Sequence, residues 1–285
     1  MKIFENDDFF DMVDKRGEAY NYKWFDGYDK MTGGIHPGDS LMLFSDKGSG
    51  KTMLALSAVH ALAKQGKTVT YITLDEMPMS ILKRIAGRER EEIRDYDLNV
   101  IDPCYRLGEF NKRQRKFDVE KNIRTEEQKK YGEFSPEYYS DKELENDVIV
   151  IDGVYLGAKE LSPLKCIYDW NVWAQQNEKI VIITILTEGE LTPIENEYIT
   201  TGEFEKKLNC SANLGTFVAY LRELGKENSK EGIACSVVRN KNDWRGRECG
   251  GQSKGTNEAL ILVVNIKRCE VLNSHYENID TYISN

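Results

Sequence analysis

The chain has 285 residues, of which 40% are hydrophobic, and a formal net charge of −9 at pH 7. This size suits one large α/β domain, or one domain with a long insertion, and the apolar content is enough for a sizeable core. No run of 18 apolar residues occurs, so we expect no membrane span. The acidic start lacks the basic-then-apolar order of a signal peptide, so we expect a cytoplasmic protein. The acidic balance argues against a protein that only coats nucleic acid, although binding needs no more than a local basic strip.

The first half of the chain predicts a strand, a helix and a second strand. Residues 40–44 (SLMLF) form a short apolar run typical of a buried strand. A glycine-rich loop follows, and residues 52–65 carry apolar side chains at helical spacing, with Gly66 as a plausible stop. Residues 69–74 (VTYITL) predict the next strand. A strand, a crossover helix and a strand together predict a parallel sheet.

The rest of the chain predicts further strands around a charged insertion. Residues 85–146 are crowded with charge, and we expect exposed helix and loop there, apart from a weak strand at 98–101. Later strands are expected at 148–151, 180–185, 215–221, 233–238 and 259–266, a helix at 163–177 and a long polar loop at 188–209. We therefore predict a single α/β domain over residues 1–285, with an N-terminal extension (1–23), the insertion (85–146) and a C-terminal tail (267–285).

A phosphate-binding loop is the strongest motif in the sequence. The segment runs Ser45, Asp46, Lys47, Gly48, Ser49, Gly50, Lys51, Thr52 and fits the spacing of a P-loop, with serine in place of the usual first glycine. Such a loop needs inward-pointing amides followed by a helix N-terminus, and the glycines allow close approach to phosphate. Lys51 can bridge the β- and γ-phosphates, and the Thr52 hydroxyl can hold Mg²⁺. The predicted cofactors are ATP and Mg²⁺.

Acidic residues at the ends of two neighbouring strands suit the same site. Asp152 follows the apolar run 148–151 and fits the carboxylate that completes the Mg²⁺ shell. Asp75 and Glu76 end the strand after the P-loop helix. Adjacent side chains on an extended strand face opposite ways, so one of the two is expected to face the γ-phosphate, and we choose Glu76.

These segments together resemble the RecA-like P-loop ATPase superfamily, and most closely the ATPase domain of DnaB-type replicative helicases. Residues 24–39 (WFDGYDKMTGGIHPGD) look like the family's lead-in helix and turn, and Leu74-Asp75-Glu76-Met77-Pro78 looks like its SLEMP segment with one residue inserted. Residues 238–246 (VRNKNDWRG) resemble the KNRNGxxG segment near the end of the helicase domain. The resemblance implies a RecA-like, mostly parallel sheet flanked by helices.

The resemblance also implies roles for particular residues. It makes Glu76 the catalytic glutamate. It makes Arg239 and Lys241 the basic residues that reach the γ-phosphate of a neighbouring subunit, so the expected partners include further copies of the chain in a ring or filament. Single-stranded DNA and replication proteins are the other implied partners.

The sequence departs from the family after the strand at 180–185. The polar sensor, usually glutamine, falls at Leu186, with Thr187 as its only polar neighbour. The following loop, expected to touch DNA, carries six glutamates before Lys206 and Lys207. Those carboxylates would repel a phosphate backbone, so either the loop points elsewhere or DNA is not gripped as in the family. Basic clusters at 112–116 and 239–247 are the alternative DNA-binding surfaces.

The sequence therefore predicts an ATP-hydrolysing RecA-like protein that acts on single-stranded DNA in replication, as a DnaB-like helicase. One alternative is a strand-exchange or annealing ATPase related to RecA and RadA. Another is a regulatory or structural subunit that binds nucleotide with little turnover. DNA-stimulated hydrolysis would distinguish the first two from the third.

Overall fold

The computed structural model describes most of the chain. The described residues are 21–86, 96–102, 106–111, 116–121, 134–156, 163–187, 199, 201–209, 214–227, 230–240, 258–265 and 268–278. Within these ranges, no helix is both long and apolar enough to cross a membrane.

Eleven strands of the described residues form one sheet, in the order β11-β10-β9-β8-β1-β7-β6-β2-β3-β4-β5. Their bounds are β1 Ser40–Ser45, β2 Val69–Thr73, β3 Leu98–Asp102, β4 Arg106–Asn111, β5 Lys116–Lys121, β6 Val148–Tyr155, β7 Ile180–Leu186, β8 Phe217–Glu227, β9 Lys230–Asn240, β10 Glu258–Asn265 and β11 Glu270–Asn278. The central strands β8-β1-β7-β6-β2-β3 are parallel, and the strands at both edges are antiparallel. The predicted α/β fold with a mostly parallel central sheet is confirmed.

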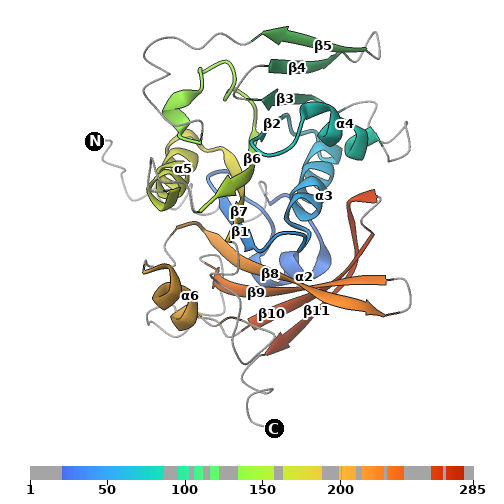
Figure 1. The fold of residues 1–285 in the computed structure, drawn as a ribbon, viewed down its shortest axis with the longest axis vertical. Helices are drawn as coiled ribbons and strands as arrows, with labels where there is room; N and C mark the ends of the chain where they lie inside the picture. Colours follow the sequence, from blue (N-terminus) through green and yellow to red (C-terminus); the bar gives the residue numbers. More distant parts are fainter. Residues whose placement is uncertain are drawn as a thin grey trace, which may run out of the picture.

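Helices cover both faces of this sheet (Figure 1). The helices are α2 Asp26–Thr32, α3 Lys51–Lys64, α4 Pro78–Ala86, α5 Pro163–Asn177 and α6 Thr201–Leu208, with a 3₁₀ turn, η2, at Pro136–Tyr138. Side chains of α2, α3 and α4 join one core cluster, and those of α5 and α6 join the other. Strand β1 supplies both clusters, because Leu41 and Leu43 point to the first and Met42 and Phe44 to the second. Its full burial explains the unbroken apolar run in the sequence.

The lead-in before β1 has the helix that the family resemblance implied. Helix α2 ends at Gly33, which adopts φ 84° and donates its N–H to the carbonyl of Asp29. A left-handed residue at this position favours glycine and satisfies an otherwise unpaired helix carbonyl.

Three segments differ from the sequence-based expectation. Strands β4 and β5 lie where exposed helix and loop were expected, and they extend the sheet beyond β3. Their charged residues hid a period-two pattern, visible in Lys116–Lys121 (KFDVEK). Helix α6 lies within the expected polar loop, and β11 lies within the expected tail, where it pairs with β10.

Candidate nucleotide-binding site

The predicted phosphate loop connects β1 to α3, with the geometry that its glycines require. Gly48 and Gly50 have φ values of 86° and 85°, which side-chain-bearing residues rarely adopt. A Cβ on Gly48 would meet nothing within 4 Å, so the loop is open at that point. Gly50 also caps the N-terminus of α3. The first amides of α3 therefore begin at the loop, where the positive end of the helix dipole favours an anion.

Lys51 extends back over this loop. Its Nζ donates hydrogen bonds to the main-chain oxygens of Asp46, at 3.1 Å, and Ser45, at 3.4 Å. Burial lowers the pKa of the Lys51 ammonium, and the carboxylates of Asp152, Asp75 and Asp46 oppose that shift. A cation is thus held beside the loop, facing three acidic groups.

Thr52, in the first turn of α3, meets Asp152 of β6. The Thr52 hydroxyl donates to Asp152 Oδ1 at 3.2 Å, and Asp152 is only 1% exposed. A hydroxyl and a carboxylate so close together are the oxygen ligands that Mg²⁺ prefers. These two residues therefore fit a magnesium ion, as the sequence indicated.

Two further hydroxyls hold the Asp152 carboxylate, and sequence reasoning missed both. Tyr71 of β2 donates to Asp152 Oδ2 at 2.8 Å, and Thr184 of β7 donates to Oδ1. Burial raises the pKa of the Tyr71 hydroxyl well above its ordinary value, and the Asp152 charge raises it further. The available signal was a polar side chain inside each apolar strand that flanks β6 in the sheet.

Asp75 and Glu76 follow β2 and have different surroundings. The Asp75 carboxyl lies against the backbone of Gly153, because a Cβ there would be 2.6 Å from Asp75 Cγ. Gly153 has φ 97° and directly follows Asp152. Burial raises the pKa of the Asp75 carboxyl, with added repulsion from Asp152 and Glu76. Glu76 instead pairs with Arg84 of α4, with 2.8 Å between Oε1 and Nη2.

The predicted γ-phosphate contacts from a neighbouring subunit lie apart from this cluster. Arg239 belongs to β9 and pairs with Val218 of β8, which is level with Met42 of β1. Met42 precedes the start of the loop, Ser45, by three positions, so Arg239 lies toward the other end of the strands from the chain's own P-loop. Lys241 lies outside the described residues.

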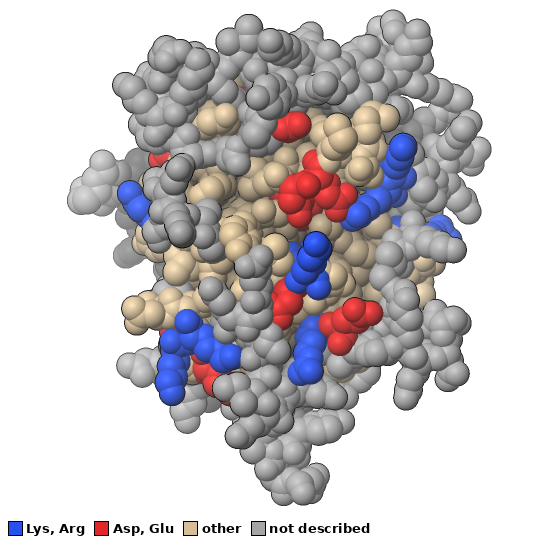
Figure 2. All heavy atoms as spheres, viewed as in Figure 1, with Lys and Arg blue, Asp and Glu red and all other residues tan. Residues whose placement is uncertain are grey.

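Charges of both signs gather on the face that carries the loop. Figure 2 shows acidic and basic side chains beside one another near the middle of this face, between the positions of β6 and α3 in Figure 1. An anionic nucleotide with a bound cation needs such a mixture, because the phosphates require basic groups and the cation requires carboxylates.

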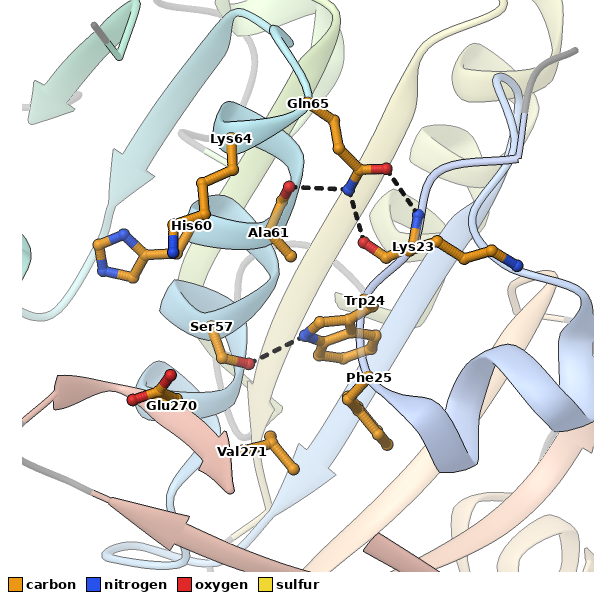
Figure 3. A pocket seen from close by; sticks show the side chains of 10 residues that line it. All are labelled: Lys23, Trp24, Phe25, Ser57, His60, Ala61, Lys64, Gln65, Glu270 and Val271. Atoms are coloured by element: carbon orange, nitrogen blue, oxygen red, sulfur yellow. Dashed lines mark hydrogen bonds between the residues drawn. The ribbon is translucent and has the colours of Figure 1, made fainter. Parts of the chain in front are cut away.

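A pocket of about 300 Å³ lies elsewhere, along the middle and C-terminal half of α3. Figure 3 shows Trp24 directed at Ser57, whose hydroxyl accepts from the indole nitrogen at 2.9 Å. The Gln65 side chain accepts from the Lys23 amide at 2.9 Å and donates to the Lys23 carbonyl at 2.6 Å. These contacts fasten the lead-in segment to α3, and the pocket shares no residue with the phosphate loop.

The sheet order and the loop together define a RecA-like ATPase fold, and comparison with solved structures confirms the fold. The ATPase domain of a DnaB-type helicase superposes with a TM-score of 0.58 at 14% identity, covering 95% of this chain and 99% of that one. The flagellar accessory protein FlaH from Methanocaldococcus jannaschii superposes with a TM-score of 0.50 at 12% identity, covering 90% and 99%. No protein-family model matches the chain, and no curated protein matches its sequence.

Proposed function

We propose that this protein binds Mg²⁺–ATP at the loop 45–52 and hydrolyses it. The observation that carries the proposal is the contact between Thr52 and Asp152, beside a phosphate loop that starts a helix. A chance glycine loop would not place a magnesium-type hydroxyl and a buried carboxylate 3.2 Å apart. The fold is the one shared with the ATPase domain of the DnaB-type helicase.

Each group in the site has a task in this mechanism. The amides at the start of α3 and the Lys51 ammonium would hold the triphosphate, with ammonium and amides stabilising charge that develops on the phosphoryl oxygens. Thr52 and Asp152 would hold Mg²⁺, which supplies charge neutralisation between the phosphates. Glu76 would orient the attacking water, for which it must leave Arg84 or carry that arginine with it.

Arg239 and Lys241 would act on a neighbouring copy of the chain. The strand register supports this, because Arg239 is level with Met42 and so lies away from its own loop. A basic residue supplied in this way is worth about 10³–10⁵ in rate. We therefore propose an assembly of copies in which hydrolysis depends on the contact between them.

We further propose that the substrate on which this ATPase acts is single-stranded DNA, with replication proteins as partners. The support is the resemblance of residues 24–39, 74–78 and 238–246 to DnaB-type helicases. The fold alone does not choose this role, because it is also the fold of a flagellar accessory protein.

The test is steady-state ATP hydrolysis with and without single-stranded DNA, with Lys51→Ala as the blank. We expect DNA to stimulate turnover, and we expect the blank to lose it. Turnover that is unaffected by DNA would remove the DNA role and leave the ATPase. Equal turnover in the blank would remove the site itself.

One observation favours a second function, nucleotide binding without turnover. The proposed catalytic carboxylate, Glu76, is paired with Arg84 at 2.8 Å. If that pair persists with nucleotide bound, the chain would serve as a nucleotide-dependent assembly subunit. Arg84→Ala separates the two functions, because freeing Glu76 would increase turnover only if the pair restrains it.

A further inference from the structure

The carboxylate of Asp46, inside the phosphate loop, is held by two strands. Thr187, immediately after β7, donates its hydroxyl to Asp46 Oδ1 at 2.8 Å. Tyr220 of β8 donates its hydroxyl to Asp46 Oδ2 at 3.1 Å. Strands β7 and β8 flank β1, from which the loop emerges. Both carboxylate oxygens of Asp46 are therefore engaged on the side of the loop that faces these strands.

The two donors are rigidly placed. Thr187 is 1% exposed, Tyr220 is 2% exposed, and the Thr187 amide donates to the Ser45 carbonyl at 3.1 Å. A buried hydroxyl with a fixed backbone loses little freedom on forming a hydrogen bond, and a bond to a carboxylate is stronger than one between neutral groups.

The same residue touches Lys51 through a different atom. The Lys51 ammonium contacts the main-chain oxygen of Asp46, whereas the side-chain oxygens accept from Thr187 and Tyr220. Lys51 is the group that would bind the phosphates. An unrestrained carboxylate one residue into the loop would compete with phosphate for that ammonium, since opposite charges at contact attract strongly in a partly buried site.

We propose that Thr187 and Tyr220 are positioning residues that hold the Asp46 carboxylate away from Lys51 and so keep its ammonium available to the nucleotide. This deepens the proposed function, on which it rests. It also gives a role to Thr187, the polar residue beside the position where the family's sensor was expected. Here that residue acts on the loop itself.

The test is the affinity for a fluorescent ATP analogue with Mg²⁺, measured well below the unfolding temperature. We expect the double variant Thr187→Val, Tyr220→Phe to bind about tenfold more weakly, because a freed carboxylate pairs with the ammonium. Adding Asp46→Asn to that variant should restore binding, because the competing charge is gone. Thr187→Ser, which keeps the hydroxyl, should bind within about twofold of wild type.

The control is Thr70→Val, which removes a fully buried hydroxyl of β2 that bonds to the Glu143 carbonyl. It should lower the unfolding temperature without changing the affinity. A triple variant as weak as the double variant would overturn the proposal, because the hydroxyls would then only support the fold. Unchanged affinity in the double variant would overturn it too. If wild type fails to bind while folded, the proposed function falls and takes this inference with it.

Discussion

The Thr52 hydroxyl donates to the Asp152 carboxylate over 3.2 Å, joining the first turn of α3 to β6 across 100 positions of sequence. Neither residue belongs to the strand that carries the phosphate loop. Their contact depends on β6 lying two places from β1 in the sheet, separated by β7. The sheet order therefore assembles the proposed magnesium site.

Removing either oxygen ligand should make nucleotide binding independent of magnesium. We expect Thr52→Val and Asp152→Asn each to lose the gain in ATP affinity that Mg²⁺ gives to wild type, because the ion would lack a protein ligand. Titrations with Mg²⁺ and with excess chelator measure this. A variant that keeps the full magnesium effect would show that its residue holds no ion.

Tyr71 should matter through Asp152 and not through its own contact with nucleotide. We expect Tyr71→Phe to lower turnover and raise the half-saturating Mg²⁺ concentration by about tenfold, since groups that orient a metal ligand have effects of that size. Tyr28→Phe is the matched control, because Tyr28 is equally buried but belongs to α2. Equal magnesium requirements in the two variants would contradict the assignment.

Gly153 should tolerate no side chain. Its φ of 97° and the Asp75 carboxyl 2.6 Å from a would-be Cβ both oppose alanine. We expect Gly153→Ala to reduce the free energy of unfolding by about 1–3 kcal/mol. Gly202→Ala in α6 is the control: a Cβ there meets nothing within 4 Å, and helix propensity predicts a gain of about 1 kcal/mol. Chemical denaturation measures both, and a harmless Gly153→Ala would refute the close packing.

Asp75 should oppose folding at neutral pH. Its folded-state pKa is raised above 3.8 by burial and by neighbouring carboxylates, so the folded protein holds this proton more tightly than the unfolded chain. That stabilisation is complete at acid pH and is lost as the pH rises through the folded-state pKa. We expect Asp75→Asn to stabilise the nucleotide-free protein at pH 7 by less than about 1 kcal/mol, since the group is half exposed.

This gain should shrink as the pH falls toward 3.8, where both chains would carry a neutral side chain at position 75. Thermal unfolding across the pH range tests the trend. A gain that does not change with pH would mean that packing, and not charge, separates the two proteins.

Much of the fold was predictable because buried parallel strands leave a plain signal. The runs at 40–44, 148–151 and 180–185 are apolar on both faces, and each lies inside a strand of the structure. The edge strands β4, β5 and β11 were not foreseen. At the edges a strand is selected by pairing with its neighbour, and charged or polar side chains there mask the alternation.

The site was predictable to the extent that its chemistry is local in sequence. The loop 45–52 lies where expected, and Asp152 reaches Thr52 as its place after a strand indicated. The contacts of Asp152 with Tyr71 and Thr184 depend on strand order and register, which a single sequence does not encode locally. The roles proposed for Glu76, Arg239 and Lys241 stay predictions.

The most direct test of the central claim is calorimetric titration of Mg²⁺–ATP into wild type and Lys51→Ala. The account predicts one site per chain in wild type and a loss of affinity of at least about tenfold in the variant, because a charged hydrogen bond to phosphate is removed. Equal affinity in the two proteins, with both folded, would contradict the assignment of loop 45–52 as the nucleotide site.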